Sequence, residues 1–93
     1  MQATATPTEK LDFDLLHRVA AGDQASFSEL YDRFAALTYG LFSSTFPDSD
    51  LVQRAMHGFW LTVWSNAPLL SRQRGTVESV LLTLAEPFAR IAA

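Results

Sequence analysis

Few residues of this 93-residue chain have side chains that could perform chemistry, and they are scattered. The two histidines, His17 and His57, have no second ligand at the spacings that metal sites use. Cysteine is absent, which excludes disulfides and thiol nucleophiles. The carboxylates gather at the starts of expected helices, where capping explains them better than acid–base catalysis does. We therefore expect no enzymatic activity, no metal and no cofactor.

Charge is weakly polarised along the chain, whose net charge is -3. Residues 1–50 include three basic and eight acidic residues, whereas residues 51–93 include four and two. A dedicated nucleic-acid binder usually has a denser basic face. The first residues show no basic cluster followed by an apolar stretch, and no apolar run approaches the roughly 20 residues that a membrane helix needs. We expect a cytoplasmic protein that does not span a membrane.

Hydrophobic periodicity predicts an all-α domain over residues 11–93, preceded by a flexible tail at residues 1–10. No alternating apolar pattern indicates a sheet, so the expected architecture is a compact bundle of about four helices. Gly22 suits the left-handed conformation that ends the first helix, and Pro87 is expected to end or kink the fourth. The expected helices are, in order, Asp12–Ala21, Asp23 to about Ser44, Asp48 or Asp50 to Asn66–Pro68, and Thr76 to about Pro87.

The third expected helix has the broadest apolar surface, which predicts that it packs against more than one neighbour. Three of its aromatic residues, Phe59, Trp60 and Trp64, could stack on nucleobases. Aromatic residues at helical spacing within such a surface are more often part of the core. We therefore predict that these rings are buried.

Four segments of the chain resemble, in order and in spacing, region two of the extracytoplasmic-function (ECF) sigma factors, which belong to the sigma-70 family. They are Ala21–Tyr31, Phe59–Trp64, Arg74–Thr76 and Leu81–Ala85. The resemblance covers roughly residues 11–89. It implies a compact helical bundle that binds RNA polymerase and opens promoters in DNA-templated transcription initiation.

In that family the third helix of region two docks on the clamp helices of the polymerase beta-prime subunit. The docking surface is normally acidic, with Glu-Asp and Gln-Glu where this chain has Gln53-Arg54 and His57-Gly58, and Leu61 follows on the same surface. The clamp helices present arginines, so Arg54 is expected to weaken this contact. The alternative is that Arg54 and His57 are solvated residues without a partner.

The family's last loop and helix capture a flipped base of the promoter -10 element. The resemblance assigns this contact to Arg72, Arg74 and Thr76, although two arginines in a loop are more often simply solvated. The family's basic C-terminal continuation is replaced here by Glu86-Pro87-Phe88. Binding of -10 promoter DNA is therefore expected to be weak or lost.

Three hypotheses of function follow from these observations. The first is a sigma region-two domain that binds polymerase and promoter. The second is a degenerate, stand-alone sigma-like domain that regulates by contact with an anti-sigma protein, another sigma domain or a second copy of itself. The third is a ligand- or metal-binding bundle that has kept only the fold. A homodimer is a further expectation if Phe88 and Ile91 are exposed at the C-terminal end.

Overall fold

A computed structural model describes residues 6–91, which form four α-helices. These are α1 (Pro7–Ala20), α2 (Gln24–Thr45), α3 (Ser49–Leu70) and α4 (Val77–Ile91). No strand occurs within residues 6–91. The predicted all-α bundle of about four helices is confirmed.

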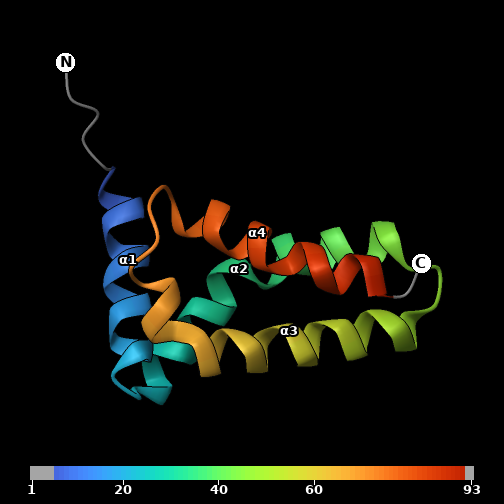
Figure 1. The fold of residues 1–93 in the computed structure, drawn as a ribbon, viewed down its shortest axis with the longest axis horizontal. Helices are drawn as coiled ribbons and strands as arrows, with labels where there is room; N and C mark the ends of the chain where they lie inside the picture. The colour runs from blue at the N-terminus through green and yellow to red at the C-terminus, as the bar shows by residue number, and fades with distance from the viewer. Residues whose placement is uncertain (1–5, 92–93) are drawn as a thin grey trace.

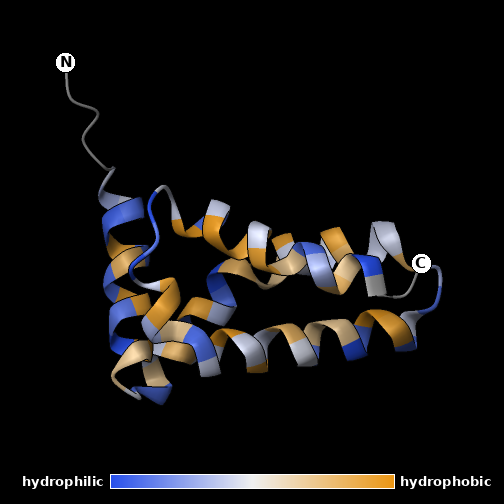
Figure 2. Cartoon of the chain, viewed as in Figure 1, coloured by the Kyte–Doolittle hydropathy of each residue, from blue (hydrophilic) through white to orange (hydrophobic). Residues whose placement is uncertain are grey.

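The helices are arranged as a bundle in which α3 and α4 run along the long axis of the domain, and α1 packs across one end (Figure 1). The domain measures 42 × 32 × 20 Å. Hydrophobic and hydrophilic residues alternate along α1, whereas α3 is hydrophobic along most of its length (Figure 2). The broad apolar surface of α3 packs against all three other helices. None of the helices described is long and apolar enough to cross a membrane.

The first helix begins earlier than the sequence predicted, because a capping box starts at Thr6. The Thr6 hydroxyl oxygen accepts a hydrogen bond from the backbone N–H of Glu9 (3.1 Å), and the Glu9 carboxylate accepts one from the N–H of Thr6. Pro7 occupies the first helical position, which favours proline. The expectation of a tail up to residue 10 is therefore wrong for residues 7–10, while residues 1–5 lie outside the described residues.

The starts of α2 and α3 follow the predicted capping. Asp23 accepts a hydrogen bond from the N–H of Ala25, and Asp48 accepts one from the N–H of Asp50. The hydroxyl of Ser26 also donates to the Asp23 carboxylate (2.7 Å), which lowers the pKa of Asp23 below its ordinary value of 3.8. Gly22 adopts the left-handed conformation (φ 92°) that was expected at the end of α1.

Two prolines, Pro68 and Pro87, lie inside helices. The predicted end of the third helix at Asn66–Pro68 is therefore wrong, and of the two outcomes predicted for Pro87, an end or a kink, the end is wrong. Pro68 cannot donate to the carbonyl of Trp64, yet α3 continues to Leu70 because that residue is buried in the core. The hydroxyl of Ser71 donates to the Pro68 carbonyl (2.9 Å) just beyond the helix end. The fourth helix, α4, also continues through its proline, Pro87, to Ile91.

The homodimer expected at the C-terminal end depends on the exposure of Phe88 and Ile91. Phe88 is partly buried and packs on Phe59, and the side chain of Ile91 lies outside the described ones, so this expectation stays a prediction.

The core is formed by one cluster of hydrophobic side chains from all four helices. The largest side chains in it that are fully buried are Phe42, Phe59, Leu15, Leu16, Leu30 and Leu81. Phe59 and Trp60 are buried as predicted, but Trp64 is only partly buried. Tyr31 of α2 is 39% exposed. The broad apolar surface of α3 is thus divided between the core and the outer surface of the domain.

Candidate functional site

A groove of about 400 Å³ separates α2 from the outer face of α3. Its lining residues are Phe27, Tyr31, Gln53, Met56, His57, Trp60 and Leu61. Three of the five residues assigned to the clamp-binding surface, Gln53, His57 and Leu61, are therefore brought together here. All three are exposed, and none carries a fixed charge, so the groove presents an apolar, largely uncharged surface.

The floor of the groove is an aromatic cluster centred on Trp60, which is 4% exposed. Its ring meets those of Tyr31 and Phe59 edge to face, with 5.2 Å between centroids in each pair. The indole Nε1 of Trp60 is buried and has no hydrogen-bond partner among the described residues. An unpaired buried donor costs roughly 1–3 kcal/mol, so this ring is held in place by packing alone.

The other two residues assigned to the clamp-binding surface, Arg54 and Gly58, lie outside the groove. Arg54 is exposed and forms no salt bridge with any described residue. Gly58 is partly buried under α4, where a Cβ atom would lie 3.5 Å from Cε1 of Phe88. The Phe88 ring in turn packs edge to face on Phe59 (5.8 Å). Gly58 is therefore part of the α3–α4 packing rather than of the open surface.

The loop between α3 and α4 carries the residues assigned to DNA binding. Arg72 and Arg74 are exposed and make no salt bridge with described residues. Thr76 instead caps α4: its hydroxyl oxygen accepts from the N–H of Ser79 (3.0 Å), and the Ser79 hydroxyl oxygen accepts from the N–H of Thr76. Gly75 has a φ of 98°, and a Cβ there would lie 2.9 Å from Ser79 Oγ, so this loop requires glycine.

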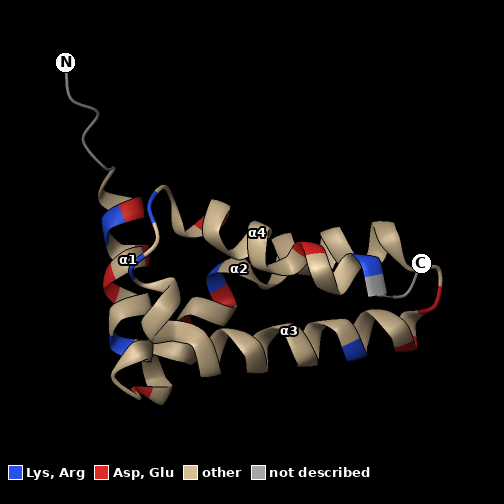
Figure 3. Cartoon of the chain, viewed as in Figure 1, with Lys and Arg blue, Asp and Glu red and all other residues tan. Residues whose placement is uncertain are grey.

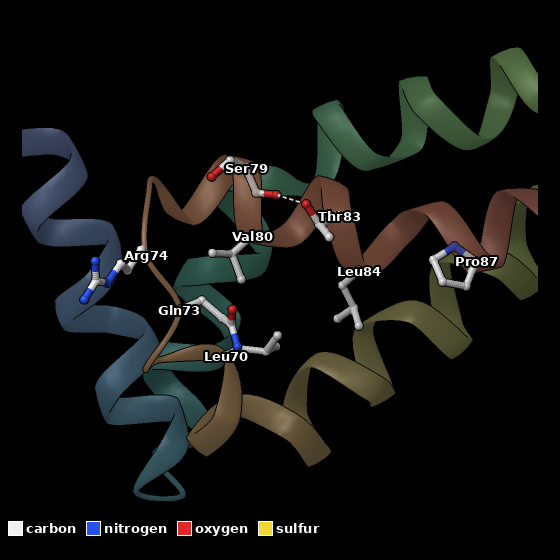
Figure 4. A pocket seen from close by; sticks show the side chains of 8 residues that line it. All are labelled: Leu70, Gln73, Arg74, Ser79, Val80, Thr83, Leu84 and Pro87. Carbon is white, nitrogen blue, oxygen red and sulfur yellow. Dashed lines mark hydrogen bonds between the residues drawn. The ribbon is translucent and has the colours of Figure 1, made fainter.

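A hollow of about 330 Å³ lies between this loop and α4 (Figure 4). Leu70, Val80 and Leu84 line its apolar side, and Gln73 and Arg74 lie at its edge. Figure 4 shows the Arg74 side chain turning toward α1 rather than into the hollow. Sequence reasoning missed this hollow, because Leu70 and Leu84 are 14 positions apart and belong to different helices.

An ion pair that the sequence did not predict links α1 to α2. Nε of Arg33 lies 2.5 Å from Oδ1 of Asp12, and the two side chains are 29% and 10% exposed, respectively. The two residues are 21 positions apart, and no local pattern identifies the pair. Because α1 also packs on α3 and α4, the pair helps to hold α1 across the end of the bundle.

Among residues 6–91, no three His, Cys, Asp or Glu side chains form a group that could hold a metal ion. His17 is exposed on α1, and His57 lies in the groove. The candidate site therefore consists of two surfaces: the groove between α2 and α3, and the loop with its adjoining hollow.

Comparison with known proteins shows that this chain is similar to the "ECF RNA polymerase sigma factor SigK" of several mycobacteria. It is 36% identical over 83 residues to the Mycobacterium tuberculosis H37Rv protein, covering 88% of this chain and 44% of that protein. It is 36% identical over 78 residues to the Mycolicibacterium vanbaalenii protein (84% and 39% covered), and 32% identical over 85 residues to that of Mycobacterium sp. strain KMS (90% and 44%).

The chain thus spans less than half the length of these relatives. No family profile matches the chain. No solved structure matches it significantly.

Proposed function

Because this chain corresponds to one region of the ECF RNA polymerase sigma factors, we propose that it acts as a region-two domain in transcription initiation, binding core polymerase and -10 promoter DNA. The observation that carries this proposal is the similarity to SigK. An alignment that covers 88% of this chain must include both the α2–α3 groove and the α3–α4 loop, wherever it starts. The groove and the loop residues Arg72, Arg74 and Thr76 therefore lie in the shared region.

For polymerase, the proposed contact surface is the exposed side of α3 formed by Gln53, Arg54, His57 and Leu61. Leu61 is 53% exposed and supplies an apolar anchor beside the groove. Arg54 opposes binding to a basic partner, because a desolvated pair of like charges can cost several kcal/mol. We expect a measurable but weakened complex. Gly58 faces Phe88 of α4 and adds no side chain to this surface.

A calorimetric titration against the isolated beta-prime clamp helices tests the polymerase contact. We expect wild type to bind with a Kd of about 10 µM or weaker, and Arg54→Asp to bind at least about tenfold more tightly. Leu61→Asp should abolish binding. The control is Leu11→Asp, which changes an exposed leucine on α1, away from the proposed contact surface, and should leave binding unchanged. Absence of wild-type binding at any accessible concentration would refute the polymerase contact.

For promoter DNA, Arg72 and Arg74 are the proposed phosphate contacts, and the adjoining hollow is the proposed site for an unstacked base. The hollow is at the lower end of the volumes that hold small ligands. The hydroxyls of Ser79 and Thr83 already donate to backbone carbonyls, which leaves the Gln73 amide as the main free hydrogen-bonding group. Two arginines and one amide predict weak binding.

Binding of single-stranded -10 DNA, measured at several salt concentrations, tests the promoter contact. Removing Arg72 or Arg74 should reduce the salt slope by about 0.7 each, as expected for one phosphate contact on a single strand. Arg90→Ala is the control, because Arg90 is paired with Glu86 on α4. Equal slopes for all variants would exclude the loop from DNA binding.

A second candidate function is a degenerate sigma-like domain that regulates through an anti-sigma or sigma partner. The specific observation that favours it is the packing of Phe88 on Gly58, which covers a position that carries a glutamate in the family. If only Arg54→Asp binds the clamp helices and wild type does not, this function is the better account.

A further inference from the structure

A second, polar pocket of about 500 Å³ lies where the start of α1 and the start of α4 meet α2. Its charged lining residues are Glu9 and Asp12 of α1, Arg33 of α2 and Glu78 of α4. Arg33 is already paired with Asp12, so Glu9 and Glu78 have no cationic partner among the described residues. Lys10, the neighbour of Glu9 on α1, is exposed but does not line the pocket. The pocket therefore carries two uncompensated carboxylates.

The basic loop between α3 and α4 borders this pocket. Thr76, the last residue of the loop, lines the pocket and caps α4. Figure 3 shows the arginines of the loop between acidic residues of α1 and of the start of α4. Arg74 and Glu78 are four positions apart, so even a fully extended chain would keep their Cα atoms within about 14 Å. The Debye length is about 10 Å at 0.1 M salt and about 30 Å at 0.01 M, so the charge of Glu78 acts on whatever Arg74 binds.

The two pockets that border the loop differ in charge. The hollow on α4, which is the proposed site for an unstacked base, has no carboxylate in its lining. The polar pocket has Glu9 and Glu78, which equal in number the two arginines of the loop. A phosphate on the side of the polar pocket would lose to these carboxylates much of the attraction that Arg72 and Arg74 provide.

We propose that Glu9 and Glu78 repel nucleic-acid phosphates from the polar pocket, which limits the affinity of the loop for DNA and directs a bound strand along the hollow. This role rests on the proposed promoter contact of Arg72 and Arg74. The two glutamates are positioning residues, because they act on the path of the strand without bonding to it.

Both glutamates also stabilise the start of a helix. The Glu9 carboxylate accepts a hydrogen bond from the N–H of Thr6 in the capping box, and glutamine can take the same part. Glu78 lies in the first turn of α4, where a negative charge interacts favourably with the helix dipole. A change from glutamate to glutamine therefore removes the charge and keeps the size of the side chain. Repulsion is screened by salt, whereas an effect on helix packing is not.

Asp50 of α3 provides a matched control for Glu78. Asp48 caps α3 and Asp50 is its second residue, just as Thr76 caps α4 and Glu78 is its second residue. Both second residues are exposed. Because α3 has 22 residues and rises about 1.5 Å per residue, Asp50 lies roughly 30 Å from the loop that follows the other end of this helix. Asp50→Asn removes an equivalent charge far from the arginines.

Binding of the 93-residue chain to fluorescently labelled single-stranded -10 DNA, measured by anisotropy from about 0.01 M to about 0.2 M salt, tests this role. We expect Glu78→Gln to bind about threefold more tightly than wild type at the lowest salt, and Glu9→Gln/Glu78→Gln about tenfold more tightly. The gain should shrink as salt rises, so the salt dependence becomes steeper than that of wild type. Asp50→Asn should leave both the Kd and the salt dependence unchanged.

The failure of this role can be told apart from the failure of the promoter contact. Binding that requires Arg72 and Arg74 but is the same in Glu9→Gln/Glu78→Gln refutes the repulsion and keeps the promoter contact. A gain that Asp50→Asn shares, or that persists undiminished at high salt, also refutes the repulsion. Binding by the double variant when wild type shows none supports it. No binding by either protein at the lowest salt refutes both the repulsion and the promoter contact.

Discussion

The contact between Gly58 and Phe88 yields the sharpest prediction about how this domain differs from the family pattern. A Cβ at position 58 would lie 3.5 Å from the Phe88 ring, which is ordinary van der Waals contact. Glycine inside a helix costs roughly 1 kcal/mol relative to alanine. Gly58→Ala should therefore raise the free energy of unfolding by about 0.5–1 kcal/mol.

A glutamate at the same position should have the opposite effect. Its side chain must extend past the Cβ into the space that Phe88 occupies, and this displaces the ring from Phe59. Truncating a fully buried phenylalanine costs roughly 3–5 kcal/mol, and Phe88 is only partly buried, so we take about half of that cost. After the gain in helix propensity, Gly58→Glu should lower the free energy of unfolding by about 1 kcal/mol.

Urea denaturation followed by far-UV circular dichroism measures both effects, and a double-mutant cycle with Phe88→Ala isolates the contact. In the Phe88→Ala background the cost of displacing the ring should vanish and only the gain in helix propensity should remain, which corresponds to a coupling of about 1.5–2.5 kcal/mol. If Gly58→Ala destabilises the domain, or if the effects of Gly58→Glu and Phe88→Ala are additive, the packing described for α4 on α3 is incorrect.

Three further predictions concern stability and titration. Trp60→Ala should lower the free energy of unfolding by roughly 3–5 kcal/mol, and Trp64→Ala by less than half as much, because that ring is only partly buried; urea melts that rank the two variants equally would contradict this burial. Thr76→Ala should cost about 1 kcal/mol through loss of the cap, whereas Thr76→Ser should cost little; thermal melts of the two variants decide whether the hydroxyl acts as a cap. Ser26→Ala should raise the pKa of Asp23 toward 3.8, which NMR titration of the carboxylate can follow. Since the pKa of Asp23 is lowered in the folded state, ionised Asp23 stabilises the fold fully at pH values above its unfolded-state pKa. This stabilisation is lost as the pH falls through the folded-state pKa, and in Ser26→Ala it should be lost at a higher pH than in wild type.

The helices could be predicted because their signals are local. Asp23, Asp48 and Thr76 cap helices at the predicted places, and the apolar spacing in α3 identified Trp60 as buried. The start of α1 at Thr6 was also encoded locally, by a threonine followed three residues later by Glu9, but the absence of apolar residues there concealed it.

Features that depend on tertiary contacts could not be predicted from the sequence. Whether a proline ends a helix depends on which residues the following turn buries. The third helix, α3, continues past Pro68 because Leu70 is buried in the core. The pairing of Asp12 with Arg33 requires the crossing of α1 and α2. The division of the expected clamp surface, with Gly58 turned toward Phe88, requires the position of α4.

The segment from Phe59 to Trp64 of α3 also matters for what happens when the domain unfolds. Its six residues are aromatic, β-branched or leucine, with no charge and no proline, which is the composition of segments that stack into cross-β assemblies. Within α3 the backbone groups of this segment are bonded inside the helix, and Phe59, Trp60 and Val63 are buried. Once the helix melts, no charged neighbour from residue 55 to residue 71 opposes intermolecular pairing. The stability of this bundle is therefore also its protection against aggregation.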